Sequence, residues 1–578
     1  MRGQVHTLAR ATFAGFFESE LMPSGLPQVR LVIFAIVILM FPALRMPLFA
    51  WYAYLGASRH APELLDVLMW PHKLLFITLA MMGTAMVSLI IWDNVFPDRR
   101  DAFIIGHLPI RARTILAARL LALTALMCLI ALGSALPSAV LYGLVAGGFS
   151  PGGIPRTVIA HFIATMGASM FAFLLLLSLQ GLLINLVPAR WLQRAIVLLQ
   201  FLFVIAALEA VLFMDPVIDA LEKAMAPGTA ERAGWMLWAP PAWFLGLYEV
   251  IAGTSRPVGH LAIPAVLGLA VLLPLAFGLY AFTYQRLTRR AVEGREADRL
   301  GGRVGREPTA AVLTAALTRT AISSAVCRFT IVTCLRSRKH RLLLTIFAGV
   351  GTTAAATGML VPLSRHGRLA SVLTADVILP IGLVFVFFLV VGLRTLFAIP
   401  AEPSANWIFK LSDAEDARLH VRGAAAAMAA LGVLPVIVAL APLHLVALGP
   451  AVTAIHSTLL LAAGFLLSEI VLNGFRRVPF TSAYNAPVAR TRWMWPFWLV
   501  GYSVFSSVLA AVEGALLRRG NGAIALAIGV AVAAFGVRAW RERDFGLAGQ
   551  ILTFNDGEED APITLALDGI PGSLKFEV

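Results

Sequence analysis

The chain has 578 residues, of which 59% are hydrophobic and only 13% charged, and its mean hydropathy is +0.84. A soluble chain of this length carries charge on about a quarter of its residues. The composition therefore excludes a soluble enzyme, a disordered chain and a fibrous repeat, and it leaves a polytopic α-helical membrane protein.

The charge balance supports the same class of protein. There are 46 Lys and Arg against 32 Asp and Glu, a net charge of +14. The basic residues lie between apolar runs, where they orient a protein across a bilayer, so no nucleic-acid partner is expected. The three cysteines form neither a CxxC pair nor a disulfide framework.

Apolar runs long enough to cross a membrane recur along the whole chain. A transmembrane helix needs about 20 predominantly apolar residues. On that basis we predict an all-α fold of about twelve transmembrane helices, in two sets of six: 31–55, 74–92, 120–145, 158–187, 195–214 and 261–282, then 342–363, 377–399, 423–448, 452–472, 497–517 and 520–540.

Basic residues gather in alternate loops. Arginines are dense in 99–113 and in 286–341, whereas the other loops carry few. The positive-inside rule then predicts that both termini and the central linker are cytoplasmic, and we expect a bacterial inner (plasma) membrane.

The two sets of six spans share several features. Each set follows an amphipathic stretch (5–21 and 312–335), and each fifth span holds one acid, Glu209 or Glu513. We predict two permease-like repeats joined by an Arg- and Gly-rich linker, with an acidic tail, at 1–287, 288–310, 311–544 and 545–578. The alternative is chance similarity between hydrophobic sequences.

Two segments depart from the repeat. Residues 215–260, between the fifth and sixth spans, contain paired prolines and several tryptophans, which suit short, partly re-entrant helices on the outer side. The tail, 545–578, has short β-prone runs separated by Asp-Gly and Pro-Gly, which predicts a small hairpin element; a frayed tail is an equally good explanation.

No catalytic motif stands out. None of the five lysines follows a glycine-rich phosphate loop, and HExxH, GxSxG and CxxC are absent. The sequence therefore predicts a transport subunit without its own nucleotide-binding site, without metal and without enzymatic activity.

The segment after the second span, 92–120, has the clearest pattern. It places Asp98, Arg99, Arg100 and Asp101 at a Pro-started turn, then a stretch ending in Leu108-Pro109 that leads to further arginines. Such a segment suits a surface that docks a soluble partner, or an Arg-rich turn that only anchors two spans.

This pattern resembles the permeases of export-type ABC transporters. In that family a six-span domain begins with an elbow helix, the segment after span two contacts the ATPase, and short helices lie between spans five and six. The resemblance covers residues 1–290 well and the second half less well. It implies that Asp98, Arg99, Arg100, Asp101, Leu108 and Pro109 contact an ATPase subunit, present in two copies, through which ATP acts.

The second-half counterpart, 394–422, lacks the Leu-Pro-Ile step of the first. The corresponding contact there falls on four residues: Glu402, Asn406, Trp407 and Lys410. The two halves are therefore expected to bind the two ATPases unequally, or one of the two contacts is degenerate.

Four ionisable residues lie within or near apolar spans: Arg45, Glu209, Glu469 and Glu513. Because charge inside a bilayer is costly, such residues line a path or pair with another helix. The sequence leaves both roles open, together with snorkelling to the interface for Glu209 and Glu513.

The favoured function is thus the membrane-spanning permease of an ATP-driven ABC exporter, with a separate ATPase. The alternative is an ion-gradient-driven secondary transporter of the major facilitator type, which also has twelve spans in two repeats. The substrate is not specified by the sequence.

Overall fold

The computed structural model describes about two thirds of the chain, in the following stretches: 2–15, 51–52, 54–60, 65–90, 110–150, 152–188, short pieces of 191–206, 238–253, 259–292, 308–366, 373–399, 401, 418–481, 500–520, 522–547 and 552. The regular structure in these stretches is helical, as predicted. The chain divides into two compact units, Met1–Val304 and Gly305–Val578, with the division inside the range 288–310.

Nine helices of the described stretches are long and apolar enough to cross a membrane. Each coincides with a predicted span: Arg113–Gly147, Gly153–Leu186, Gly259–Tyr284, His340–Met359, Ala375–Leu396, Arg418–Leu448, Pro450–Val471, Val500–Arg518 and Gly522–Asp544. Helix α3 (Leu65–Ile90) contains most of a tenth predicted span, 74–92, and is not among the nine. Most of 31–55 and 195–214 lies outside the described residues.

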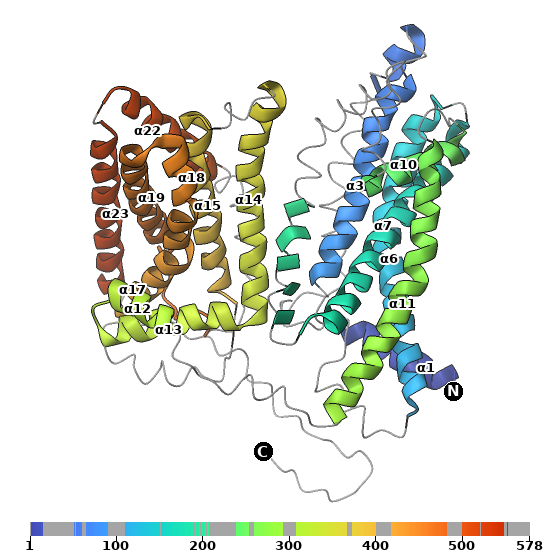
Figure 1. Cartoon of the computed structure of the whole chain (residues 1–578), viewed down its shortest axis with the longest axis horizontal. Helices are drawn as coiled ribbons and strands as arrows, with labels where there is room; N and C mark the ends of the chain where they lie inside the picture. Colours follow the sequence, from blue (N-terminus) through green and yellow to red (C-terminus); the bar gives the residue numbers. More distant parts are fainter. Residues whose placement is uncertain are drawn as a thin grey trace, which may run out of the picture. The chain divides into compact units, whose positions relative to one another are not determined.

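The first unit is built from α3, α6 (Ala112–Gly147), α7 (Gly153–Leu186) and α11 (Ala262–Val292). Helix α7 packs against the other three, and a short helix, α1 (Arg2–Gly15), packs against α6. A second short helix, α10 (Pro240–Ala252), packs against α3, α7 and α11 at the end of the unit away from α1 (Figure 1). The segment predicted to hold short helices thus contains a buried one.

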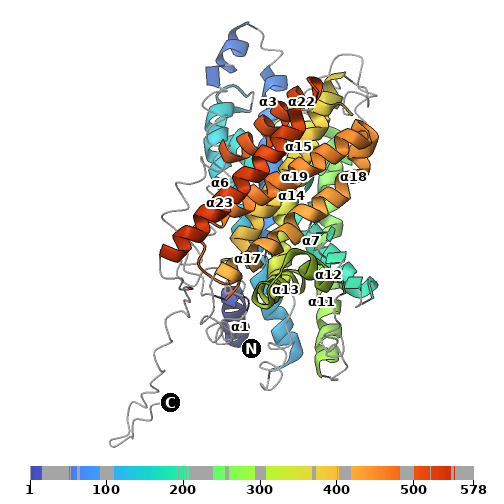
Figure 2. The same cartoon turned by 90° about the vertical axis from the view of Figure 1, so that its left-hand side faces the viewer.

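The second unit is built from α14 (Arg338–His366), α15 (Ala375–Leu396), α17 (Arg418–Met428), η8 (Ala429–Val433), α18 (Leu434–Leu448), α19 (Pro450–Val471), η9 (Ser503–Val508), α22 (Leu509–Arg518) and α23 (Gly522–Leu547). Helix α19 lies beside α23 along much of its length (Figure 2). Two short helices, α12 (Pro308–Leu317) and α13 (Ala321–Arg336), run across one end of these long helices (Figure 1).

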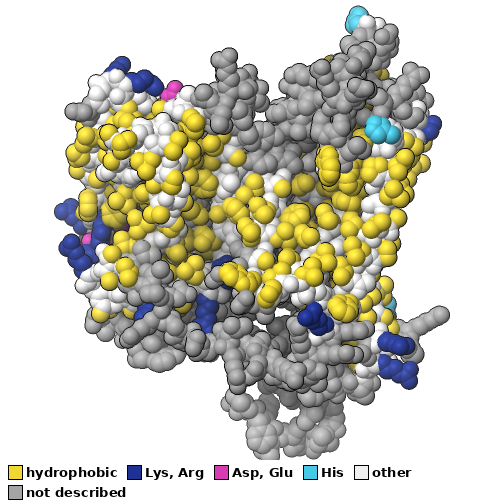
Figure 3. Space-filling view, in the orientation of Figure 1, with side chains coloured by type: hydrophobic (Ala, Val, Ile, Leu, Met, Phe, Trp, Pro, Cys, Tyr) yellow, Lys and Arg dark blue, Asp and Glu magenta, His cyan; other side chains and the backbone are white. Residues whose placement is uncertain are grey.

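Helices in an apolar medium must satisfy their own polar groups. Accordingly, Ser and Thr hydroxyls inside the spans donate to the carbonyl one turn earlier, as Thr84 does to Ala80 at 2.9 Å and Ser468 to Gly464 at 2.7 Å. On the face drawn in Figure 3, the described side chains along the long helices are largely hydrophobic. This surface is that of a membrane-spanning protein.

Small residues set the closest helix contact in the first unit. Gly143 and Gly147 lie four residues apart on α6, and a Cβ atom at either one would lie 2.5 Å from an atom of Val158 or Ile154 on α7. Close approach at a Gly-xxx-Gly pair is typical of membrane helix packing.

We predict that Gly143→Leu destabilises the protein by about 1–3 kcal/mol, because the added side chain collides with α7. Gly278→Leu is the matched control, since nothing lies within 4 Å of a Cβ at Gly278. The apparent melting temperature in mild detergent checks this. Equal melting temperatures for the two variants would contradict the packing of α6 on α7.

Helix α13 buries Cys327 and Cys334 on the side that packs against α17 and its neighbours. Burial raises the pKa of the Cys327 thiol to about 11 and that of Cys334 to about 12. Because the thiolate is the reactive form, we expect both cysteines to resist maleimide at pH 7.5 and to react once the protein is denatured. Mass spectrometry of the labelled peptides checks this; rapid labelling of the native protein would contradict the docking of α13.

Candidate functional site

The structure describes only two of the residues predicted to act. Both predicted ATPase-contact segments lie outside the described residues: Asp98, Arg99, Arg100, Asp101, Leu108 and Pro109 in the first, and Glu402, Asn406, Trp407 and Lys410 in the second. Arg45 and Glu209 lie outside them as well. Glu469 and Glu513 are described, and both are fully buried.

Glu469 forms an ion pair with Arg541. The carboxylate is on α19, and it accepts two hydrogen bonds from the guanidinium on α23, at 2.9 and 2.6 Å. Both side chains are at least 96% buried. The pair therefore ties together the two helices that lie side by side and offsets two charges that their apolar surroundings would otherwise disfavour. Both bonds end on Oε2 of Glu469, whereas its buried Oε1 has no hydrogen-bond partner among the described residues.

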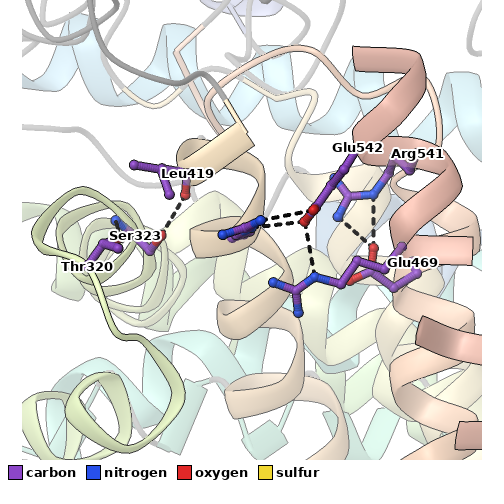
Figure 4. Close-up of polar contacts among 8 residues, drawn as sticks. Thr320, Ser323, Leu419, Glu469, Arg541 and Glu542 are labelled. Carbon is purple, nitrogen blue, oxygen red and sulfur yellow. Dashed lines mark hydrogen bonds and ion pairs between the residues drawn. The ribbon is translucent and has the colours of Figure 1, made fainter. Parts of the chain in front are cut away.

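A second ionic group lies close to this pair at the same end of α23. Glu542 accepts hydrogen bonds from Arg422 on α17, at 2.9 Å to each carboxylate oxygen, and from Arg538 one turn earlier, at 3.1 Å. Figure 4 shows Glu542 between the two guanidinium groups, with the Glu469–Arg541 pair beside it. One carboxylate thus links α17 to α23.

Glu513 is bonded to a histidine. Nδ1 of His456 on α19 lies 3.0 and 2.9 Å from the two carboxylate oxygens of Glu513 on α22. The ring of His444 on α18 lies edge-on to His456, with centroids 4.8 Å apart. All three side chains are buried, so the second unit holds a compact set of two imidazoles and one carboxylate inside its membrane-length helices.

The first unit holds a buried pair of its own. Nζ of Lys73 on α3 donates to the Glu249 carboxylate on α10 at 2.7 Å, and both side chains are at least 96% buried. The ammonium also lies 4.8 Å from the centre of the Tyr248 ring, where a cation interacts favourably with the π system.

A cluster of aromatic rings, here called the aromatic cage, lies beside this ion pair. The fully buried His161 ring on α7 contacts the rings of Phe76, Tyr142 and Tyr248, with centroids 5.1 to 5.8 Å apart. Its Nε2 lies 3.2 Å from the Ser138 hydroxyl, whereas no partner is found for its buried Nδ1 among the described residues. The cage excludes water from the pair and so strengthens it.

Sequence reasoning missed Lys73 and Glu249. It assigned Lys73 to a loop between the first two spans, whereas the structure places it within α3, and it gave Glu249 no role. The signal that points to them is a single charge inside an otherwise apolar stretch, WPHKLLF for one and FLGLYEVIA for the other. The sequence also gives no sign of the histidine group. His444, His456 and Glu513 lie on three separate helices and meet only in the fold.

Some residue spacings recur in the two units. The helices that contain the second predicted span of each half, α3 and α15, each have a Pro followed two residues later by Lys73 or Gly382 (WPHKLLF and LPIGLVF). In α7 and α19 a Pro is followed six residues later by His161 or His456. Gly382 packs closely on α19: a Cβ there would lie 2.9 Å from Cδ2 of Leu460 and 3.4 Å from Nε2 of His456.

The buried pairs and histidines described above place ionic contacts, and imidazole and carboxylate groups that can accept a proton, between the helices. Among the described residues no group of three His, Cys, Asp or Glu side chains is arranged to hold a metal ion. No protein-family model, curated protein or solved structure matches the chain. What the residues themselves establish is an α-helical protein whose long apolar helices suit a membrane. Its described part buries three pairs: Lys73–Glu249, Glu469–Arg541 and His456–Glu513.

We predict that Lys73→Met destabilises the protein by about 3–5 kcal/mol, because Glu249 stays buried without its ammonium partner. The double variant Lys73→Met/Glu249→Leu should recover most of the loss, since two apolar side chains replace the pair. Thermal unfolding in detergent measures both.

Arg518→Gln is the control for this experiment. It breaks the Arg518–Asp376 pair, whose side chains are 63% and 76% exposed, and exposed pairs contribute roughly 0–1 kcal/mol. An equally small effect of Lys73→Met would show that the buried pair does not stabilise the first unit.

Proposed function

We propose that this chain is the membrane-spanning permease subunit of an ATP-driven ABC exporter, which moves its substrate outward with energy from a separate ATPase subunit. The observation that carries the proposal is the placement of the short helices. In each unit the first described helices, α1 in one and α12–α13 in the other, pack at one end of the long helices. In the first unit the buried α10 comes directly before the last long helix. Both placements agree with the elbow helix and the outer short helices expected of such a permease.

The proposal includes twelve spans in two parallel six-span repeats. It is supported by two pairs of features: Pro71–Lys73 and Pro380–Gly382 at the second predicted spans, and Pro155–His161 and Pro450–His456 at the fourth. After a domain is duplicated, its two copies keep equivalent positions while the residues at some of these positions change.

The proposed ATPase contacts follow the second span of each half. The first lies between α3 and α6, and the second between α15 and α17. Because α1 packs against α6 and α13 against α17, the helix that continues from each segment also contacts the elbow helix of its unit. Movement of an ATPase against either segment would then reach the bundle through two packed elements. Both termini, the linker and the acidic tail would share the cytoplasmic side with the two ATPase copies, in a bacterial inner membrane.

The second candidate, ion-gradient-driven transport, is favoured by one specific observation. His444, His456 and Glu513 lie together and buried within membrane-length helices, and such groups carry protons in secondary transporters. On the exporter proposal the same residues are structural. The predicted role of Glu469 and Glu513 in a substrate path stays a prediction.

We predict that the full chain, extracted in mild detergent from its native membrane, brings a stoichiometric soluble ATPase with it. Arg99→Glu combined with Leu108→Arg should remove that partner, because the changes reverse a charge and insert one at the proposed contact. Quantitative mass spectrometry and ATP hydrolysis by the purified sample measure the outcome.

Arg518→Glu is the matched charge reversal, at an exposed site in α22, and it should leave the partner bound. No ATPase in the wild-type sample, together with loss of transport when the proton gradient is discharged, would replace the exporter with the secondary transporter. In that case His456→Gln should abolish transport while the protein stays folded.

A further inference from the structure

A groove of about 730 Å³ runs into the second unit between the start of α13, α17–η8, α19 and α23. It is lined at one end by charged and hydroxyl side chains and along its length by apolar ones. Neither the ion pairs nor the predicted ATPase contacts account for it.

The charged end is cationic. Arg319, Arg422 and Arg538 line it, and the neighbouring Glu542 offsets one of the three positive charges, which leaves an excess of two. The side chains of Arg422 and Arg538 are 38% and 30% exposed, so their guanidinium groups remain accessible. Nε of Arg538 donates to Glu542, and the two Nη atoms of Arg538 make no hydrogen bond within the described residues. Guanidinium groups of this kind bind phosphate oxygens in pairs.

Hydroxyl groups fix the rim beside these arginines. Thr320 caps the N-terminus of α13 by accepting from the Ser323 amide at 3.3 Å, and the Ser323 hydroxyl donates to the Leu419 carbonyl at 2.9 Å (Figure 4). These bonds hold the start of α13 against α17. The N-terminal dipole of α13 adds positive potential to the same end of the groove.

The remaining wall is apolar. From Arg422 it continues over small residues to Val433, eleven residues or about 16 Å along the helix. The η8 turn, a π-helix, supplies Ala429 and Val433 to this wall, and on the facing helices the wall includes Phe465 and Phe535. A slot this long and apolar, within helices that suit a membrane, fits a hydrocarbon chain.

We propose that this groove binds one anionic phospholipid of the surrounding bilayer, with its phosphate at Arg319 and Arg538 and an acyl chain along the apolar wall. The two ends of the groove match the two ends of such a lipid in charge and in polarity. A free phosphate would leave the apolar length uncovered, and an uncharged lipid would leave the arginines without a partner. The inference does not depend on the exporter proposal.

The test uses the full chain, stripped of lipid in mild detergent and then given phosphatidylglycerol or phosphatidylcholine with the same acyl chains. Native mass spectrometry measures the fraction that retains one lipid. We expect phosphatidylglycerol to be retained about ten-fold more tightly than phosphatidylcholine, because basic residues attract anionic headgroups. Arg319→Gln/Arg538→Gln should abolish this preference.

Two further variants separate the two ends of the site. Ala426→Phe fills the groove and should abolish retention of both lipids, whereas Ala533→Phe, on an exposed face of α23 outside the groove, should not. Arg518→Gln should keep the lipid preference.

Three results would overturn the proposal. They are equal retention of the two lipids by the wild type, an unchanged preference in Arg319→Gln/Arg538→Gln, and unchanged retention in Ala426→Phe. Displacement of phosphatidylglycerol by millimolar inorganic phosphate alone would also overturn it, since it would show that the site recognises the phosphate and not the lipid.

Discussion

The cost of placing charge inside apolar helices constrains this protein more than any other interaction. Where a charge enters the described part of the bundle it has a partner on another helix: Lys73 with Glu249, Glu469 with Arg541, and Glu513 with His456. Apolar helix faces resemble one another, so packing alone discriminates poorly between neighbours. A buried pair that is satisfied in only one arrangement specifies which helices meet. The three pairs link α10 to α3, α23 to α19, and α22 to α19.

Sequence patterns predicted the helices well and the contacts between them poorly. Hydropathy depends on neighbouring residues, and nine predicted spans are membrane-length helices in the described residues. Ion pairs depend on residues far apart in the chain, and Lys73 and Glu249 are separated by 176 residues. No local pattern in the sequence predicts that these two residues pair. The predicted coupling segments and the tail beyond 547, apart from the buried Leu552, lie outside the described residues, and their roles stay predictions.

The two units bury different pairs. In the first, the Glu249 carboxylate accepts from the ammonium of Lys73, and in the second the Glu513 carboxylate contacts the imidazole of His456. The Tyr248 ring lies against Lys73 in the first pair, whereas a further imidazole, His444, lies beside His456 in the second. On the exporter proposal this asymmetry matches the unequal coupling segments, so that one half would transmit ATP-driven movement more strongly than the other.

We propose that a separate ATPase contacts this chain at two segments. The most direct measurement places a photo-crosslinking amino acid at Leu108, at Trp407 and, as a control, at Arg518, and irradiates intact membranes. The exporter proposal predicts that Leu108 and Trp407 crosslink to an ATP-binding protein of one kind, with a stronger product from Leu108. It predicts no such product from Arg518. Crosslinks from Leu108 and Trp407 to lipid or to the chain itself, with no nucleotide-binding protein among the products, would contradict it.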